Sequence, residues 1–392
     1  MSTVESYQMK NEKVVIVSYY RWWDKRQKYF YELYKNKGYD VVYYVSSFNH
    51  ITKKNDILDI PETAEIIPTP IYYSNFSLKR VFSNIIFSIK VMKKIDDIKP
   101  STIIVLLPSN ILSTFIARYS KKNNTKLIVD ILDLWPESLP INKAQKIILN
   151  PLLSMWKYLR TYSIRESDLV ILECKYYYEV LKNELCEKDS KILYLQKSNG
   201  TNLMQKNIDD VIKFVYLGSI NHIIDIELMV DLLKKVNLRK NVYVDIIGTG
   251  EREDYFINLL NQNNIKFKFW GPIFDNEKKL SILSKAHFGL NIMKDNVAVG
   301  LTTKSVEYLE SNLPLINSIP FDTEELIKEY GAGYNIKLIP NREFVNNIVN
   351  LTNYEYNILA KNSRDLFWDK FSTNNFKKKL SEILFENRED IV

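Results

Sequence analysis

The sequence predicts an α/β protein made of two Rossmann-like domains, and three observations support this. The chain has 392 residues, which is too long for a single hydrophobic core and suits two domains of similar size. A strand-helix-strand pattern begins at residues 13–18 and begins again at residues 214–219. An irregular polar stretch at residues 198–202 separates the two halves.

Composition limits the classes of function. The chain is 46% hydrophobic and 26% charged, as is typical of globular proteins, with a net charge of +7. The polar first dozen residues and the lack of a long apolar run predict neither a signal peptide nor a membrane-spanning helix. Cys174 and Cys186 fit neither a metal site nor a disulfide framework, so we expect a reducing cytoplasm. Lysine and arginine are spread over amphipathic helices without a recognition motif, so we expect no nucleic-acid partner.

The first half contains the expected elements in order. Residues 13–18 form an apolar run that ends in a polar turn, like the first strand of a parallel sheet. A helix over 25–37, followed by Gly38 and a strand over 41–45, completes the first unit. Later apolar runs predict strands at 102–107, 127–130, 168–172 and 191–195.

Residues directly after these strands are candidates for binding a ligand, because ligands bind at the carboxyl ends of parallel strands. Their side chains suit a sugar acceptor. Carboxylates bind sugar hydroxyls, and a tryptophan ring packs on a pyranose face. For the aromatic residues and the histidine a packing role is an alternative, and for Glu137 the alternative is to stabilise a helix N-terminus. The candidates are Tyr20, Arg21, Trp22, His50, Asp133, Trp135 and Glu137.

Two basic amphipathic stretches, 72–99 and 143–160, also lie in the first half. Such helices can lie on an anionic membrane surface. The alternative is a pair of crossover helices with solvated basic faces. In the first stretch we expect an apolar face of Leu78, Val81, Phe82, Ile85, Ile86, Ile89 and Met92, and cations at Lys79, Arg80, Lys90, Lys93 and Lys94.

Residues 299–316 predict a loop, a helix and a buried strand. Gly300 permits close approach of the backbone, and Thr302 or Thr303 can serve as the N-cap. A loop that leads into a helix N-terminus is a ready anion site. Glu307, about one turn into the helix, can accept two hydroxyl hydrogen bonds, so the stretch suits a nucleotide sugar. An ordinary amphipathic helix with a solvated glutamate is the alternative.

The run K-x-x-E-Y-L-x-x-x-x-P-L-I, which begins at Lys304, resembles the donor-site motif of GT-B-fold retaining glycosyltransferases of group 1 (family 4-like). In that family the residue matching Glu307 binds the ribose of the nucleotide, and the preceding loop receives the diphosphate. The family pattern has another glutamate eight positions earlier, where this chain has Val299. Many relatives also carry Arg and Lys in the turn that corresponds to 219–225, which has neither.

Further segments resemble the family in the same order along the chain: the strand that ends at Gly218, the Gly-x-Gly turn at 248–250, and residues 267–273, which match the segment that reads the base. Residues 133–138 resemble the same stretch in capsule, O-antigen and exopolysaccharide enzymes. The resemblance implies an acceptor-binding domain over 1–197, a donor-binding domain over 198–365 and a helix over 366–392 that crosses back to the first domain. The implied donor-binding residues are Gly218, Ser219, Gly248, Gly250, Ile273, Lys294, Gly300, Leu301, Thr302, Thr303, Lys304 and Glu307.

The expected activity is transfer of a sugar, with retention, from a nucleotide sugar to a glycan acceptor in bacterial surface polysaccharide synthesis. We expect a UDP-sugar as donor, an acceptor carried on a polyprenyl diphosphate, and a cytoplasmic protein peripheral to the inner membrane face. No carboxylate pair of the metal-binding kind follows a strand, so we expect no metal and no other cofactor. Without a metal, Lys304 or Lys294 would stabilise the negative charge on the leaving diphosphate. The candidate catalytic residues are Asp133, Glu137 and Lys304. A protein-glycosylating transferase, an epimerase on the same fold and a non-catalytic scaffold subunit remain alternatives.

Overall fold

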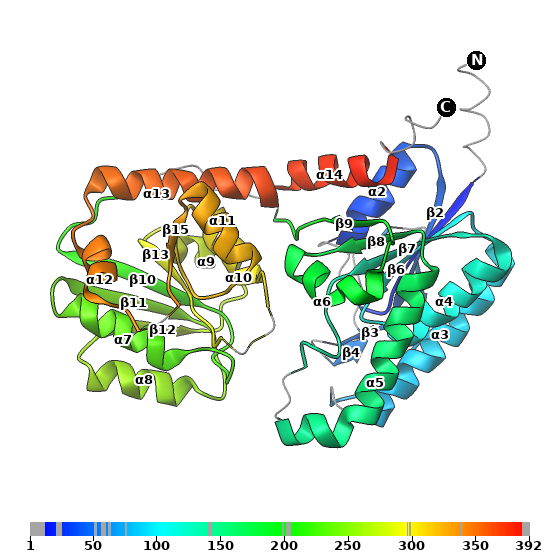
Figure 1. Cartoon of the computed structure of the whole chain (residues 1–392), viewed down its shortest axis with the longest axis horizontal. Helices are drawn as coiled ribbons and strands as arrows, with labels where there is room; N and C mark the ends of the chain where they lie inside the picture. Colours follow the sequence, from blue (N-terminus) through cyan, green and yellow to red (C-terminus); the bar gives the residue numbers. More distant parts are fainter. Residues whose placement is uncertain are drawn as a thin grey trace, which may run out of the picture. The chain divides into compact units, whose positions relative to one another are not determined.

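The structure is a computed structural model that describes residues 12–20, 26–50, 53–55, 60–61, 64–74, 77–139, 143–197, 200, 205–295, 297, 299–337 and 339–385. The chain divides into two compact units. The first unit comprises Met1–Leu195 together with Lys377–Val392, and the second unit comprises Gln196–Phe376. Each unit contains a parallel sheet covered by helices (Figure 1). The predicted α/β class with two Rossmann-like sheets is therefore confirmed.

The first sheet has seven parallel strands in the order β5-β2-β1-β6-β7-β8-β9. Its central strand, β6, is buried along its whole length, because helices cover both faces of a parallel sheet. A short antiparallel pair, β3 (Phe48–Asn49) and β4 (Lys54–Asn55), follows β2. The sheet strands are β1 (Lys13–Ser18), β2 (Asp40–Ser46), β5 (Ala64–Ile67), β6 (Thr102–Leu107), β7 (Lys126–Ile131), β8 (Leu169–Leu172) and β9 (Ser190–Ile192).

Helices of the first unit lie on both faces of this sheet. α3 and α5 both pack against α4 on one face, and α2 packs against β1 and β2. The C-terminal helix contacts α2: Lys377 forms an ion pair with Glu32 at 3.0 Å, and the ring of Phe385 contacts that of Tyr34. The helices are α2 (Lys28–Asn36), α3 (Leu78–Ile98), α4 (Asn110–Asn123), α5 (Lys143–Glu166), α6 (Lys175–Leu185) and, from Lys377 onward, α14 (Thr373–Phe385).

The orientation of α3 differs from that of an ordinary crossover helix with a solvated basic face. Its predicted apolar face is exposed or half-buried, and Leu78 is 87% exposed. The face that meets the core instead carries Arg80, Ser83, Asn84 and Ser88 beside a few apolar residues. These polar groups are tolerated because they find partners; the hydroxyl of Ser83, for example, donates to the carbonyl oxygen of Pro70 at 2.8 Å. The predicted solvated basic face is therefore wrong for Arg80, which is buried.

α5 exposes an apolar surface in the same way. Ile147, Ile148, Leu152 and Met155 are all exposed, and no described side chain from 144 to 159 is fully buried. Among the residues of the helix whose burial is described, the first that is fully buried is Arg160. The inner side of α5 makes polar contacts with α4, including paired hydroxyl groups. α3 and α5 thus present apolar side chains to the outside of the first unit.

The second sheet has six parallel strands in the order β12-β11-β10-β13-β14-β15. Read in chain order this is 3-2-1-4-5-6, the Rossmann arrangement, with its switch point between β10 and β13. The strands are β10 (Val211–Leu217), β11 (Asn241–Ile247), β12 (Lys266–Gly271), β13 (Phe288–Asn291), β14 (Leu315–Asn317) and β15 (Gly333–Asn335). The helices are α7 (Ile226–Asn237), α8 (Glu253–Gln262), α9 (Asn276–Leu283), α10 (Thr303–Glu310), α11 (Asp322–Tyr330), α12 (Arg342–Val349), α13 (Asn353–Leu366) and the π-helix η2 (Phe367–Phe371).

Candidate functional site

The switch point of the second sheet brings the main predicted residues together. β10 and β13 are neighbours, but the chain leaves β10 towards β11 and leaves β13 towards β14, in opposite directions. Gly218 and Ser219 follow β10, and α10 begins close by: a Cβ added to Gly218 would lie 3.8 Å from Cδ of Lys304. The end of β10 and the N-terminus of α10 therefore meet at the position where Rossmann folds bind ligands.

α10 begins as the sequence predicts. Thr302 is the N-cap, and its hydroxyl oxygen accepts a hydrogen bond from the N–H group of Ser305 at 3.2 Å. Leu301 is buried, whereas Thr303 is exposed in the first turn. The first turn of the helix contains no acidic residue that would compete with an anionic ligand.

Lys304 is the candidate cation of this site. Its ammonium group lies 5.1 Å from the centroid of the Tyr216 ring, and it forms no ion pair with any residue in the described part of the chain. Burial lowers the pKa of Lys304 to about 7. A buried charge without a counterion is costly, so a bound anion would stabilise the protonated form.

Glu307 lies one turn further along α10 and is held by two lysines. Its Oε1 atom accepts hydrogen bonds from Nζ of Lys197 at 2.6 Å and from Nζ of Lys279 at 3.1 Å. Burial acts to raise the pKa of Glu307, but the two ammonium groups hold it below its usual value. Glu307 is therefore ionised at neutral pH. Sequence reasoning missed both lysines, because they lie 110 and 28 residues from Glu307 and belong to no motif.

The glycines at 248 and 250 are explained by packing between turns. A Cβ at Gly248 would lie 1.9 Å from the carbonyl oxygen of Gly218, and one at Gly250 would lie 2.2 Å from that of Ile220. The turn after β11 thus supports the turn after β10 directly. Ile273, which follows β12, is half-buried.

The loop after β13 is fixed by backbone hydrogen bonds. The N–H group of Lys294 donates to the carbonyl oxygen of Ile223 at 2.9 Å, so this loop adjoins the loop after β10. The carbonyl oxygen of Gly300 accepts from both the N–H and the hydroxyl group of Thr323. Val299, where the family motif has its other glutamate, packs against the apolar core of the second unit.

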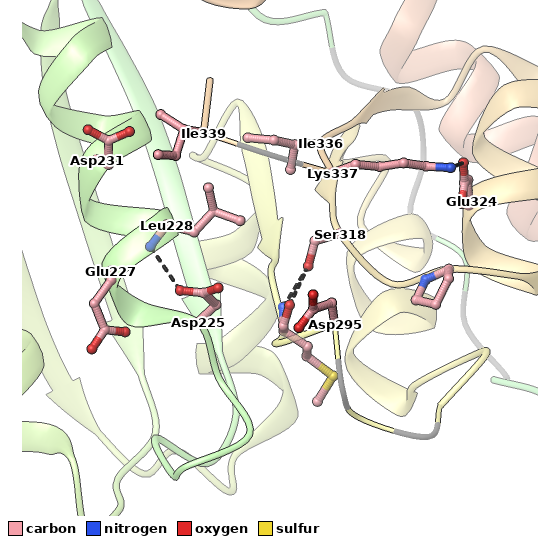
Figure 2. Close-up of a pocket in the computed structure, with 12 residues that line it drawn as sticks. Asp225, Glu227, Leu228, Asp231, Asp295, Ser318, Glu324, Ile336, Lys337 and Ile339 are labelled. Carbon is pink, nitrogen blue, oxygen red and sulfur yellow. Dashed lines mark hydrogen bonds and ion pairs between the residues drawn. The ribbon is translucent and has the colours of Figure 1, made fainter. Parts of the chain in front are cut away.

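A cavity of about 600 Å³ lies elsewhere on the second unit, between α7 and the segments that follow β13, β14 and β15 (Figure 2). The cavity is lined by five carboxylates and one lysine. The lysine, Lys337, forms an ion pair with Glu324 at 2.6 Å. Asp225, another lining residue, caps α7 by accepting from the N–H group of Leu228. An acidic lining repels phosphate groups, and none of the predicted donor-binding residues borders this cavity.

Four predicted acceptor-binding residues gather around Arg80 in the first unit. The Arg80 guanidinium lies 4.0 Å from the centroid of the Trp135 ring and donates to the hydroxyl oxygen of Tyr20. The Tyr20 and His50 rings pack edge to face at 4.8 Å. Burial raises the pKa of Asp133, and Arg80 is among the groups that oppose this shift. The cluster combines a cation, a carboxylate and aromatic rings at the carboxyl edge of the sheet.

Arg80 belongs to this cluster, whereas the sequence interpretation counted it among the cations of a helix that can lie on anionic lipid. A signal for its true position was present, because Arg80, Ser83, Asn84 and Ser88 recur at helical spacing and form a polar stripe. That stripe is the buried one.

The carboxylate of Glu137 forms an ion pair with a buried arginine. Its Oε2 and Oε1 atoms accept hydrogen bonds from Nη1 and Nη2 of Arg160 at 2.6 and 2.9 Å. Arg160 is buried and also bonds Glu184 and the carbonyl oxygen of Trp135. Burial acts to raise the pKa of Glu137, but Arg160 and Lys157 hold it below its usual value. Both oxygens of Glu137 are thus engaged in an ion pair with Arg160, and the catalytic and sugar-binding roles of Glu137 stay predictions.

Two predicted acceptor-binding residues, Arg21 and Trp22, lie outside the described residues. Among the residues that are described, no group of three or more His, Cys, Asp or Glu side chains could hold a metal ion. Within the same part of the chain, no helix is long and apolar enough to cross a membrane.

Comparison with solved structures identifies the fold. No family model matches the sequence, and no curated protein does. The chain is similar to sucrose-phosphate synthase from Thermosynechococcus elongatus (TM-score 0.67, 12% identity, 95% of this chain and 98% of that one). It is also similar to the lipopolysaccharide outer core galactosyltransferase WaaB (TM-score 0.65, 12% identity, 96% of this chain and 99% of that one). A further similar structure is Anabaena HepE, solved in complex with UDP (TM-score 0.64, 11% identity, 95% of this chain and 98% of that one). The chain has the GT-B fold.

The contacts of Glu137 predict an effect on stability. We expect Glu137→Gln to lower the free energy of unfolding by about 1.5–3 kcal/mol, because Arg160 stays buried and loses charged hydrogen bonds. Glu179→Gln is the matched control, since that exposed residue pairs only loosely with Lys182 at 3.6 Å and should change stability little. Denaturant unfolding measures both. Equal stability of the two variants would show that the structural role is wrong.

Proposed function

We propose that this protein is a glycosyltransferase that binds a nucleotide sugar on its second unit and a sugar acceptor on its first. The observation that carries the proposal is that Lys304 and Glu307 lie one turn apart on α10, next to the switch point of the sheet. A cation that pairs with no described carboxylate, at a helix N-terminus, suits a diphosphate, and an ionised carboxylate one turn later suits a ribose diol. HepE was solved with UDP, which supports a UDP-sugar as the donor.

In this proposal the leaving diphosphate is stabilised by the protein itself. Lys304 and the free N–H groups at the start of α10 meet the charge that develops on it. Lys294, in the loop joined to the turn after β10, is the second candidate cation. Gly218 lets the backbone approach the phosphates at the switch point. No side chain is assigned as a nucleophile, and transfer proceeds with retention and without a metal.

The acceptor site consists of Tyr20, His50, Asp133 and Trp135 around Arg80. Arg80 covers one face of the Trp135 indole at 4.0 Å, so a pyranose would pack on the other face. The Asp133 carboxylate is the candidate acceptor of sugar hydroxyl hydrogen bonds. Its raised pKa also suits a group that exchanges a proton with the attacking hydroxyl.

An exposed apolar surface on α3 and α5 supports a membrane-bound acceptor. Leu78 and Phe82 on α3, and Ile147 and Ile148 on α5, are exposed on helices that share one face of the sheet. Exposed apolar helix faces flanked by lysines, such as the exposed Lys79 and Lys93, fit the interface of an anionic membrane. We therefore propose a peripheral protein that acts on a sugar carried by a polyprenyl diphosphate in surface polysaccharide synthesis.

Transfer can be tested directly with a panel of nucleotide sugars. We expect turnover, measured as release of free nucleotide, with at least one UDP-sugar, and we expect it to continue in excess EDTA. Loss of turnover in EDTA and its recovery with Mg²⁺ would contradict the proposed charge stabilisation. Binding of nucleotide without turnover on any sugar would favour a scaffold subunit.

The low pKa of Lys304 predicts how UDP affinity depends on pH. The ammonium group binds the diphosphate and is lost as pH rises through about 7, whereas the phosphates of UDP are fully ionised above about pH 7. Affinity should therefore fall between about pH 7 and 9, by at most about tenfold per pH unit. Calorimetric titration measures this. Lys304→Arg, which stays charged throughout, should abolish the fall; an identical fall in that variant would exclude Lys304 as its cause.

Membrane association can be tested with vesicles. The apolar side chains would insert between lipids while Lys79 and Lys93 interact with anionic headgroups, each contributing about 1 kcal/mol that salt screens. We expect co-sedimentation with anionic vesicles that Leu78→Ser/Phe82→Ser weakens at any salt concentration, and that Lys79→Glu/Lys93→Glu weakens mainly at low salt. Lys377→Glu, on the helix that packs against α2, is the control. Absence of vesicle binding at low salt would favour a water-soluble acceptor.

A further inference from the structure

Two lysines outside every recognised motif converge on one oxygen of Glu307. Lys279 lies on α9. Lys197 lies outside the helices, and its backbone N–H group donates to the carbonyl oxygen of Phe371, in η2, at 2.9 Å. Both Nζ atoms bond Oε1, at 2.6 and 3.1 Å. The side chains of Lys279 and Glu307 are only 14% and 13% exposed. The contact is therefore a built part of the second unit rather than a surface ion pair.

The two contacts leave the carboxylate with one oxygen fixed and the other available. No described residue donates a hydrogen bond to Oε2 of Glu307. An ionised carboxylate can only accept hydrogen bonds, whereas a protonated one would present a donor to a hydroxyl group. Holding Oε1 between two cations keeps Glu307 ionised and restricts its rotation, so Oε2 keeps one position before any ligand arrives.

We infer that Lys197 and Lys279 are positioning residues that make Glu307 selective for the ribose hydroxyls of a nucleotide. This inference rests on the proposed function, because it takes Glu307 to face the ribose of the donor. A site built to hydrogen-bond a hydroxyl discriminates against the analogue that lacks it, because its polar group is then left without a partner. Hydrogen bonds to charged groups would give about 10- to 100-fold discrimination between UDP and 2′-deoxy-UDP.

The experiment measures the ratio of the dissociation constants of 2′-deoxy-UDP and UDP by calorimetry. We expect a ratio of about 10 to 100 for the unmodified protein. Lys279→Met and Lys197→Met should each lower the ratio at least about threefold, mainly by weakening UDP, and Glu307→Gln should bring it close to one. Lys279→Arg, which keeps the charge, should retain most of the ratio. Lys278→Met is the matched control, because its exposed side chain is adjacent in sequence.

The outcomes separate this inference from the proposed function. A merely structural role of the lysines would weaken both nucleotides equally and leave the ratio unchanged, which would overturn the inference. Tighter binding of UDP by either methionine variant would also overturn it, because the lysines would then compete with the ribose for Glu307. If the unmodified protein binds UDP without discrimination, the inference fails while the donor site stands. If it binds neither nucleotide, the proposed donor site itself fails.

Discussion

Parallel strand pairing is the constraint on which both units depend. Every strand of a parallel sheet ends at the same edge, so residues far apart in sequence are delivered to one place. In the second unit this edge joins Gly218, after β10, to Lys304, more than eighty residues later. In the first unit it joins Tyr20, His50 and Trp135. Opposite departure of the chain at the switch point then leaves room for a ligand.

Two buried arginines of the first unit are held by ion pairs. Arg160 is neutralised by Glu137 and Glu184, and Arg26 by Asp130, whose carboxylate bonds it at 2.7 and 2.8 Å. Each charge has a partner of opposite sign, as buried charges require. Lys304 forms no ion pair with any described residue, but neither does Lys206, so a functional interpretation of Lys304 depends on its position at the switch point.

Local patterns determined what the sequence could predict. The two parallel sheets, the Thr302 cap and the position of Glu307 on α10 follow from apolar runs and capping chemistry within a few residues. The gathering of Tyr20, His50, Asp133 and Trp135 follows from their positions after strands. The partners of Glu137 and Glu307 depend on side chains from other helices, and no local pattern specifies them. The burial of Arg80 was not predicted, because an amphipathic pattern does not show which side of a helix packs against the core.

The contact between the turns after β11 and β10 has a consequence for binding thermodynamics. With no space for a Cβ at Gly248 or Gly250, the two turns form one block whose conformation is established when the sheet folds. The conformational entropy of ordering the turn at Gly218 is therefore lost during folding and not when a ligand arrives. A ligand at this edge meets a rigid surface, so its association should show little of the unfavourable entropy that accompanies the ordering of a mobile glycine loop.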